Sequence, residues 1–239
     1  MKASSSDALL EVEAIAFDLD GTLLDTVHDL AAACNALLAE LEYPPLPLEV
    51  IRTMIGKGMG NLVARMLAVS TGESHEAIDA RASTDALRRY QAHYAVLHGR
   101  ATRPFPGTIE GLVRLSSLGI PLAVITNKAT QFVRSHLAQA GIEHFFAIVI
   151  GGDDLPTRKP DPGPLFHVAN FFGIAPARLL MVGDSANDVQ AARAAGCPVL
   201  IVPYGYNEGN SVHELDVDGI VRTVEAVADR IRFVAPTPQ

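Results

Sequence analysis

The sequence predicts an α/β fold in which a doubly wound, mostly parallel sheet carries an inserted helical unit. Short apolar runs of the length of a buried strand alternate with segments of helical periodicity. This alternation is typical of a parallel sheet that is covered by helices on both faces. The expected strands are residues 14–17, 122–125, 146–150, 179–182 and 199–202, and the expected helices between them are 108–118, 129–140, 165–172 and 186–195.

The segment from Thr26 to about His98 interrupts the alternation of strands and helices. It has no strand-like run, and its apolar residues recur at helical spacing. We expect helices over residues 27–41, 48–55, 61–69 and 78–97. Thr26 and Asp29 fit a capping pair at the first of these helices. The sequence therefore predicts a core domain of residues 1–24 and 101–239 and an all-helical cap domain of residues 25–100.

Composition restricts the possible partners and locations. The chain of 239 residues is 49% hydrophobic and has a net charge of −8, whereas nucleic acids and anionic membranes require a basic face. It has no uncharged apolar run of about 18 residues, which a membrane-spanning helix requires. Cys34 and Cys197 lie far apart, so we expect two buried thiols and no disulfide. These features favour a cytoplasmic protein without nucleic-acid or membrane partners.

Two carboxylates follow the first predicted strand. Asp18 and Asp20 are two residues apart, so on an extended backbone their side chains face the same way. An ordinary turn rich in Asp and Gly is the alternative interpretation. The flanking residues argue against it. Phe17 buries the approach to the pair, Gly21 relieves the backbone beside the two like charges, and Thr22 adds a hydroxyl group. We interpret the pair as a site for chemistry.

Polar residues also follow the later strands. Thr126 and Asn127 follow the second, and Asp184 and Asp188 follow the fourth. The alternative interpretations are a helix cap at Thr126 and at Asp184, and an acid in the first helical turn at Asp188. Parallel strands bind ligands at their carboxyl ends, so we expect a cluster of four carboxylates that holds Mg²⁺ or Ca²⁺. Lys159 is the candidate cation for a substrate, and a solvated loop lysine is the alternative.

These segments resemble the four motifs of the haloacid dehalogenase superfamily. They are Asp18-x-Asp20-Gly21-Thr22, Thr126-Asn127, Lys159-Pro160 and Gly183-Asp184-x-x-Asn187-Asp188. The resemblance implies a Rossmann-like core with a helical cap inserted after the first motif. It also implies Mg²⁺-dependent hydrolysis of a phosphate ester through an aspartyl-phosphate. The acid at Asp20 favours phosphatases and phosphomutases, because dehalogenases lack an acid at that position.

The resemblance assigns a role to each motif residue. Asp18 is expected to be the nucleophile, and Asp20 the general acid that later becomes the general base. Thr126, Asn127 and Lys159 are expected to hold the phosphoryl oxygens. The expected metal ligands are Asp18, the backbone carbonyl of Asp20, and Asp184, with Asp188 orienting them.

The substrate is the least constrained prediction. Arg52 and Lys57 in the cap are candidate contacts for a second anionic group, although an exposed lysine beside a helix-ending glycine is equally plausible. Segments 151–162 and 204–207 resemble bacterial phosphoglycolate phosphatases, which implies that 2-phosphoglycolate is converted to glycolate and phosphate. The alternatives are pyrophosphate, a sugar phosphate or an aminosugar phosphate as substrate, and a phosphomutase similar to β-phosphoglucomutase.

A phosphate-binding module without turnover is disfavoured, because both Asp18 and Asp20 are present. The partner is expected to be a small phosphorylated metabolite, and the protein a monomer or homodimer. Scattered histidines receive no role and are expected at the surface or the core edge; they are His28, His93, His136, His144 and His167.

Overall fold

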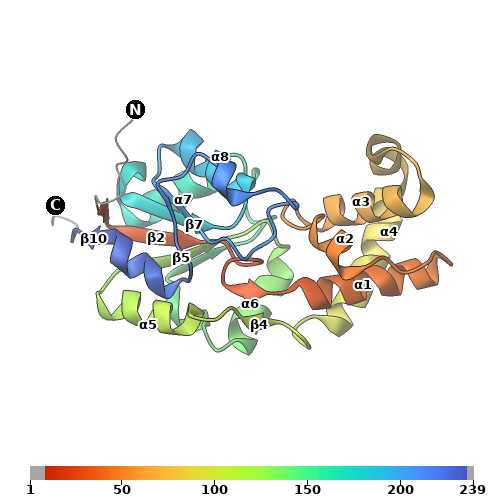
Figure 1. The fold of residues 1–239 in the computed structure, drawn as a ribbon, viewed down its shortest axis with the longest axis horizontal. Coiled ribbons are helices and arrows are strands. Elements are labelled where there is room, and N and C mark those ends of the chain that lie inside the picture. The colour runs from red at the N-terminus through yellow and green to blue at the C-terminus, as the bar shows by residue number, and fades with distance from the viewer. Residues whose placement is uncertain (1–8, 236–239) are drawn as a thin grey trace.

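A six-stranded parallel sheet forms the centre of the protein (Figure 1). The computed structural model describes residues 9–235, with the backbone alone at 75–77 and 79–83. The strand order is β6-β5-β2-β7-β8-β9, and every neighbouring pair is parallel. The predicted α/β fold is confirmed. The strands are β2 (Ala14–Phe17), β5 (Leu122–Ile125), β6 (Ile148–Ile150), β7 (Leu179–Gly183), β8 (Val199–Ile201) and β9 (Gly219–Ile220).

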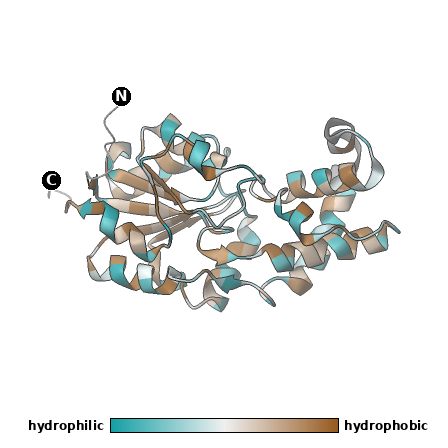
Figure 2. Ribbon diagram, viewed as in Figure 1, coloured by the Kyte–Doolittle hydropathy of each residue, from teal (hydrophilic) through white to brown (hydrophobic). Residues whose placement is uncertain are grey.

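Helices cover both faces of this sheet because its strands are apolar on both sides. Ile15 and Phe17 of β2 belong to the cluster that includes Leu112, whereas Ala14 and Ala16 belong to the cluster that includes Leu165. The strands are accordingly hydrophobic along their length in Figure 2. The helices are α5 (Thr108–Ser117) and α6 (Thr130–Gln139) on the first face, and α7 (Gly163–Phe172) and α8 (Ala186–Ala195) on the second.

Short elements complete the core. β1 (Leu10–Val12) pairs in parallel with β10 (Ile231–Phe233), which brings the first and last described elements together. Short 3₁₀ helices are Glu143–Phe145, Pro176–Arg178, Val212–Glu214 and Glu225–Arg230. None of the helices within residues 9–235 is both long and apolar enough to cross a membrane.

The residues between β3 (Leu24–Asp25) and β4 (Arg103–Pro104) form a helical unit with its own hydrophobic cluster. Figure 1 shows its helices beyond the end of the sheet, and β3 and β4 pair antiparallel where the chain leaves and re-enters the core. The predicted boundaries at residues 25 and 100 stay a prediction. The helices are α1 (Val27–Glu40), α2 (Leu48–Arg52), α3 (Met59–Thr71) and α4 (His75–Leu97).

The predicted capping pair at the start of α1 is wrong. Thr26 makes no side-chain capping bond, and the carboxylate of Asp29 turns to the segment that follows α4. It accepts hydrogen bonds from the N–H groups of Gly99 (2.8 Å), Ala101 (2.8 Å) and Thr102 (3.0 Å) and from the Thr102 hydroxyl (2.6 Å). These three backbone N–H groups bind the carboxylate more strongly than the N–H groups at the start of α1 would. Asp29 therefore joins the two connections of the helical unit.

Two smaller predictions have definite outcomes. Cys34 and Cys197 are buried free thiols, as expected.

His136 is only 1% exposed, so its expected position at the surface or core edge is wrong. It lies on α6 beneath α4, where the helical unit covers it, and the local sequence carries no sign of that cover.

Candidate active site

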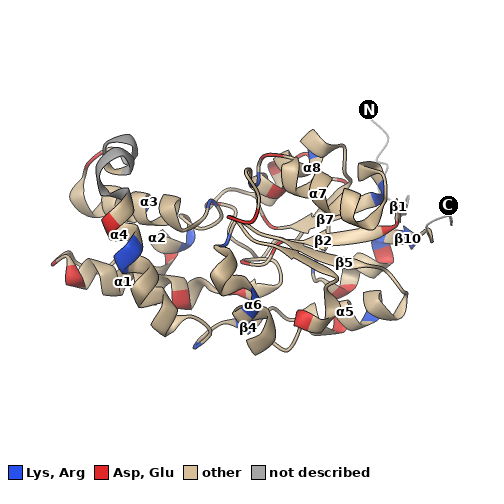
Figure 3. Ribbon diagram, turned by 180° about the vertical axis from the view of Figure 1, so that it is seen from behind, with Lys and Arg blue, Asp and Glu red and all other residues tan. Residues whose placement is uncertain are grey.

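The site lies at the carboxyl ends of three neighbouring strands. Asp18 follows β2, Thr126 follows β5 and Asp184 follows β7, and β2 lies between the other two strands in the sheet. Charged loop segments gather at this end of the sheet, which faces the helical unit (Figure 3). Parallel strands thus bring together side chains that are more than a hundred residues apart in the sequence.

Lys159 is a buried cation between two carboxylates. Its side chain is 1% exposed, and Nζ lies 3.0 Å from Oδ1 of Asp18 and 2.6 Å from Oδ1 of Asp188. Nζ also donates a hydrogen bond to the carbonyl of Ile125 at 2.7 Å. Burial lowers the pKa of the Lys159 amine, but the two negative charges outweigh burial and raise the pKa above its usual value. The interpretation of Lys159 as a solvated loop lysine is therefore excluded.

Three buried carboxylates form a candidate metal centre. Asp18, Asp184 and Asp188 each place one oxygen so that all three atoms lie within 4.8 Å of one another. Burial raises the pKa of Asp18 to about 6. The charge of Lys159 only partly offsets the effect of burial, and the charge of Asp188 raises the pKa further. Burial and the charges of Asp188 and Asp18 raise the pKa of Asp184 well above its usual value. Ionisation of all three groups requires more positive charge than Lys159 supplies.

Asp184 is the carboxylate that most needs a cation. It accepts hydrogen bonds from the Thr22 hydroxyl (3.0 Å) and the Tyr206 N–H (2.5 Å), but no ion pair to it occurs among the described residues. Gly21, with φ of 92°, and Gly205 leave room beside it, since a Cβ at either position would lie within 2.3 Å of Asp184 Oδ2. Oxygen donors around a buried, unpaired carboxylate fit a divalent cation such as Mg²⁺.

Asp188 also shapes the turn between β7 and α8. Its Oδ2 accepts hydrogen bonds from the Ser185 N–H (3.0 Å), the Ser185 hydroxyl (2.8 Å) and the Asp184 N–H (3.2 Å). Asp188 thus completes a capping box with Ser185 through Oδ2 while its Oδ1 pairs with Lys159. Its expected role in orienting the metal ligands stays a prediction.

The carboxylate of Asp20 does not join the predicted cluster of four. Both of its oxygens lie 3.1 Å from Nζ of Lys128, whose side chain is 1% exposed. Sequence reasoning missed Lys128, although it directly follows Thr126 and Asn127 at the end of β5. A lysine at that place was the available signal. The expected metal contact of the Asp20 backbone carbonyl stays a prediction.

Asn127 connects the site to the helical unit. Its Nδ2 donates hydrogen bonds to the carbonyl of Lys159 at 2.8 Å and to the carbonyl of Gly56 at 3.0 Å. Thr126 is 3% exposed, and its hydroxyl accepts a hydrogen bond from the Lys128 N–H at 3.2 Å. Thr126, Asn127 and Lys159 therefore lie together, as predicted, although their contacts with phosphoryl oxygens stay a prediction.

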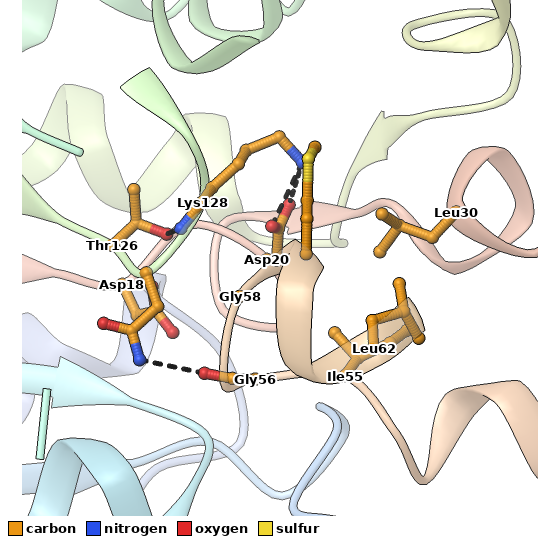
Figure 4. A pocket seen from close by; sticks show the side chains of 11 residues that line it. Asp18, Asp20, Leu30, Ile55, Gly56, Gly58, Leu62, Thr126 and Lys128 are labelled. Atoms are coloured by element: carbon orange, nitrogen blue, oxygen red, sulfur yellow. Dashed lines mark hydrogen bonds and ion pairs between the residues drawn. The ribbon is translucent and has the colours of Figure 1, made fainter. Parts of the chain in front are cut away.

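A cavity of about 30 Å³ lies between the sheet edge and the helical unit (Figure 4). The core contributes its polar wall, and the helical unit contributes its apolar wall. The polar side chains are Asp18, Asp20, Thr126, Asn127 and Lys128, and the apolar ones are Leu30, Ile55, Met59 and Leu62.

Arg52 and Lys57 do not line this cavity. Arg52 donates hydrogen bonds to the carbonyls of Tyr204 (2.8 Å) and Gly205 (3.2 Å). Lys57 forms an ion pair of 2.6 Å with Glu208 and is 46% exposed. Both side chains join the helical unit to the segment after β8. Their role in specificity stays a prediction that requires a rearrangement.

The family assignment follows from comparison with known proteins. The haloacid dehalogenase-like hydrolase family matches residues 15–202. The chain belongs to this family. The matched residues contain all four strand-end motifs, so the hydrolase has its family's motifs at the edge where its buried carboxylates and lysines meet.

Phosphatases are among the proteins that this hydrolase is similar to. It is 48% identical over 219 residues to the phosphoglycolate phosphatase of Thiobacillus denitrificans, with 92% of this chain and 95% of the relative covered. It is 49% identical over 216 residues to that of Nitrosospira multiformis, with 89% and 92% covered. The crystal structure of a predicted phosphoglycolate phosphatase from Haemophilus somnus has a TM-score of 0.84 and 33% identity, with 91% and 97% covered. The prediction of a phosphatase of the haloacid dehalogenase superfamily is confirmed.

Proposed function

We propose that this phosphatase is Mg²⁺-dependent and converts 2-phosphoglycolate to glycolate and phosphate through an aspartyl-phosphate on Asp18. One observation carries the mechanism: two carboxylates two residues apart have different cationic partners, Asp18 with Lys159 and Asp20 with Lys128. Separate environments allow one carboxyl group to act as nucleophile and the other to move a proton. The relatives that are named phosphoglycolate phosphatases support the substrate.

In the first step an Asp18 oxygen attacks the phosphorus atom. A bond forms between that oxygen and phosphorus, and the bond from phosphorus to the glycolate oxygen breaks. The electron pair of the broken bond goes to the glycolate oxygen, which takes a proton from the Asp20 carboxyl group. Glycolate leaves, Asp20 is ionised, and the phosphoryl group stays on Asp18.

In the second step the Asp20 carboxylate takes a proton from a water molecule. The water oxygen bonds to phosphorus, and the bond from phosphorus to Asp18 breaks with its electron pair returning to the Asp18 carboxylate. Phosphate leaves, and Asp20 again carries the proton that the next cycle needs. Asp20 therefore serves as acid and then as base, and each proton is accounted for.

The remaining site residues stabilise charge. Thr126, Asn127 and Lys159 would hold the phosphoryl oxygens, where fixed donors supply most of the rate enhancement. Asp18, Asp184, Asp188 and the Asp20 carbonyl are the groups that would hold or orient Mg²⁺. When bound, the ion supplies positive charge beside the phosphoryl group.

Phosphate release from a panel of phosphate esters and pyrophosphate tests the proposal. The panel contains 2-phosphoglycolate, a hexose phosphate and an aminosugar phosphate, each with Mg²⁺ and with EDTA. We expect 2-phosphoglycolate to be among the best substrates, EDTA to abolish release, and Asp18→Asn to be inactive. Poor turnover of 2-phosphoglycolate beside a faster ester would refute the substrate and leave the phosphatase assignment intact.

Intact-protein mass spectrometry tests the intermediate separately. Acid-quenched wild-type enzyme should carry one phosphoryl group during turnover, and Asp18→Asn should carry none. An isomerised sugar phosphate without phosphate release would instead indicate a phosphomutase.

The predicted cytoplasmic location and the monomeric or homodimeric state stay predictions.

A further inference from the structure

We propose that Lys128 and Tyr94 are positioning residues that hold the Asp20 carboxyl group for proton transfer, and that Tyr94 makes this transfer depend on the docked helical unit. The inference rests on the proposed role of Asp20 as general acid, but it does not depend on which ester is the physiological substrate.

The ammonium group of Lys128 donates three hydrogen bonds. It donates to Oδ1 and Oδ2 of Asp20, both at 3.1 Å, and to the Tyr94 hydroxyl at 2.8 Å. An ammonium group has three N–H bonds, so these contacts satisfy all of them. Because the Lys128 side chain is 1% exposed, water does not replace a lost partner without rearrangement. Lys128 therefore fixes where the Asp20 carboxyl group points.

Tyr94 of the helical unit holds Lys128 in place. It lies on α4, whereas Lys128 follows β5 and Asp20 follows β2. The Tyr94 ring is fully buried, and its centroid lies 5.0 Å from Nζ of Lys128 and 4.9 Å from the centroid of Phe132 on α6. The aromatic ring is thus clamped against the core while its hydroxyl accepts the hydrogen bond from Lys128.

These contacts connect Tyr94 of the helical unit through Lys128 to Asp20. If the helical unit moves away from the sheet, Tyr94 leaves Lys128, whose ammonium group then has one partner fewer to hold it in place against Asp20. A displacement of about 1 Å at a reacting group costs on the order of 10²-fold in rate. Proton donation to the leaving oxygen is therefore efficient only when the helical unit covers the site.

The leaving group of the substrate separates proton transfer from other effects. Ethyl phosphate releases a strongly basic alkoxide that needs a proton, whereas 4-nitrophenyl phosphate releases a stable phenolate that needs almost none. The ratio kcat/KM reports the steps up to loss of the alcohol, so it isolates the action of Asp20 as an acid. We expect Tyr94→Phe to lower kcat/KM roughly tenfold or more for ethyl phosphate and 2-phosphoglycolate, and less than about threefold for 4-nitrophenyl phosphate. Lys128→Met should show the same pattern with a larger loss.

Tyr90→Phe is the matched control. Tyr90 lies one helical turn before Tyr94 and stacks on it with the ring centroids 5.9 Å apart. Its buried hydroxyl has no hydrogen-bond partner among the described residues. Removal of this hydroxyl should leave the ratio between the two esters at the wild-type value. If Lys128→Met does not fold, as judged by thermal unfolding, Tyr94→Phe alone still decides the test.

The other outcomes overturn the proposal. Equal losses with all three substrates indicate a purely structural role, and unchanged rates in Tyr94→Phe indicate no role. A loss confined to 2-phosphoglycolate means that Lys128 binds the substrate carboxylate instead. A wild-type enzyme that hydrolyses ethyl phosphate but not 2-phosphoglycolate refutes the proposed substrate, and the comparison of ethyl and 4-nitrophenyl phosphate remains decisive.

Discussion

The Nζ atom of Lys159 lies 3.0 Å from Oδ1 of Asp18, and both side chains are buried. This contact places a fixed positive charge beside the proposed nucleophile. The same ammonium group lies 2.6 Å from Asp188, so one cation serves two of the three clustered carboxylates. The site is consequently short of positive charge, and that shortage makes its response to substitution and to metal predictable.

Lys159→Met should lower kcat/KM for the best substrate by about 10²- to 10³-fold. It removes a charged donor from the place where phosphoryl charge develops. The variant should also unfold at a lower temperature in EDTA, because Asp18 and Asp188 lose their shared partner. Arg114→Met is the control, since Arg114 is exposed and pairs with Asp229 away from the cavity. Near wild-type activity in Lys159→Met would contradict the assignment of Lys159.

Mg²⁺ should raise the unfolding temperature, and Asp184→Asn should remove most of this increase. A ligand that binds only the folded state stabilises it by about 2.7 kcal/mol at a concentration of 100 Kd. Burial and the charges of Asp188 and Asp18 raise the pKa of Asp184, so its replacement by a neutral side chain should also stabilise the protein in EDTA. Differential scanning calorimetry with and without EDTA measures both effects. The exposed Asp229→Asn serves as control, and an equal Mg²⁺ shift in both variants argues against the metal centre.

His136 should make stability depend on pH between about pH 6.5 and 4. Burial and the charge of Lys128 lower the pKa of His136 from 6.5 to about 4. In that interval the unfolded chain binds a proton that the folded protein does not, so stability is lost as the pH falls. The loss amounts to at most about 3 kcal/mol.

The variant His136→Phe should reduce that loss, because phenylalanine suits the aromatic surroundings of Tyr94 and has no group to protonate. Urea unfolding at pH 7.5 and pH 5 measures the difference, with the exposed His144→Phe as control. An identical pH dependence in His136→Phe and wild type would count against a buried neutral imidazole.

Asp29→Asn should destabilise the protein by about 2 to 4 kcal/mol. Hydrogen bonds to a charged group each contribute about 1.5–3 kcal/mol, and asparagine has only one oxygen for the N–H groups of Gly99, Ala101 and Thr102. Urea unfolding gives the change in free energy. Asp85→Asn on the same helical unit is the control, because Asp85 and its partner Arg88 are both exposed and solvent screens their attraction.

Residues placed by strand order were predictable from the sequence. The apolar runs locate the strands, and the carboxyl ends of parallel strands meet at one edge, so Asp18, Thr126 and Asp184 could be brought together without a structure. Lys159 was predictable by chemistry, because buried carboxylates and a phosphate both require a cation.

Residues placed by packing between the two units were not predictable in this way. The contact of Asp20 with Lys128 spans 108 residues, and the contact of Lys128 with Tyr94 depends on how α4 lies on α6. Arg52 and Lys57 illustrate the same difficulty. Their charge was recognised, but only the docked position of α2 and α3 shows that they face the segment after β8 and not the cavity.

The antiparallel pairing of β3 with β4 restricts how the helical unit can move. Both covalent connections to the core run side by side there, and Leu24 lies opposite Pro104 in the pairing. The cavity of about 30 Å³ has room for only one or two water molecules, so the lining residues must separate before an organic phosphate enters. We expect this separation to be a rotation about the paired connections, in which the hydrogen bond from Asn127 to Gly56 breaks while the pairing of β3 with β4 stays.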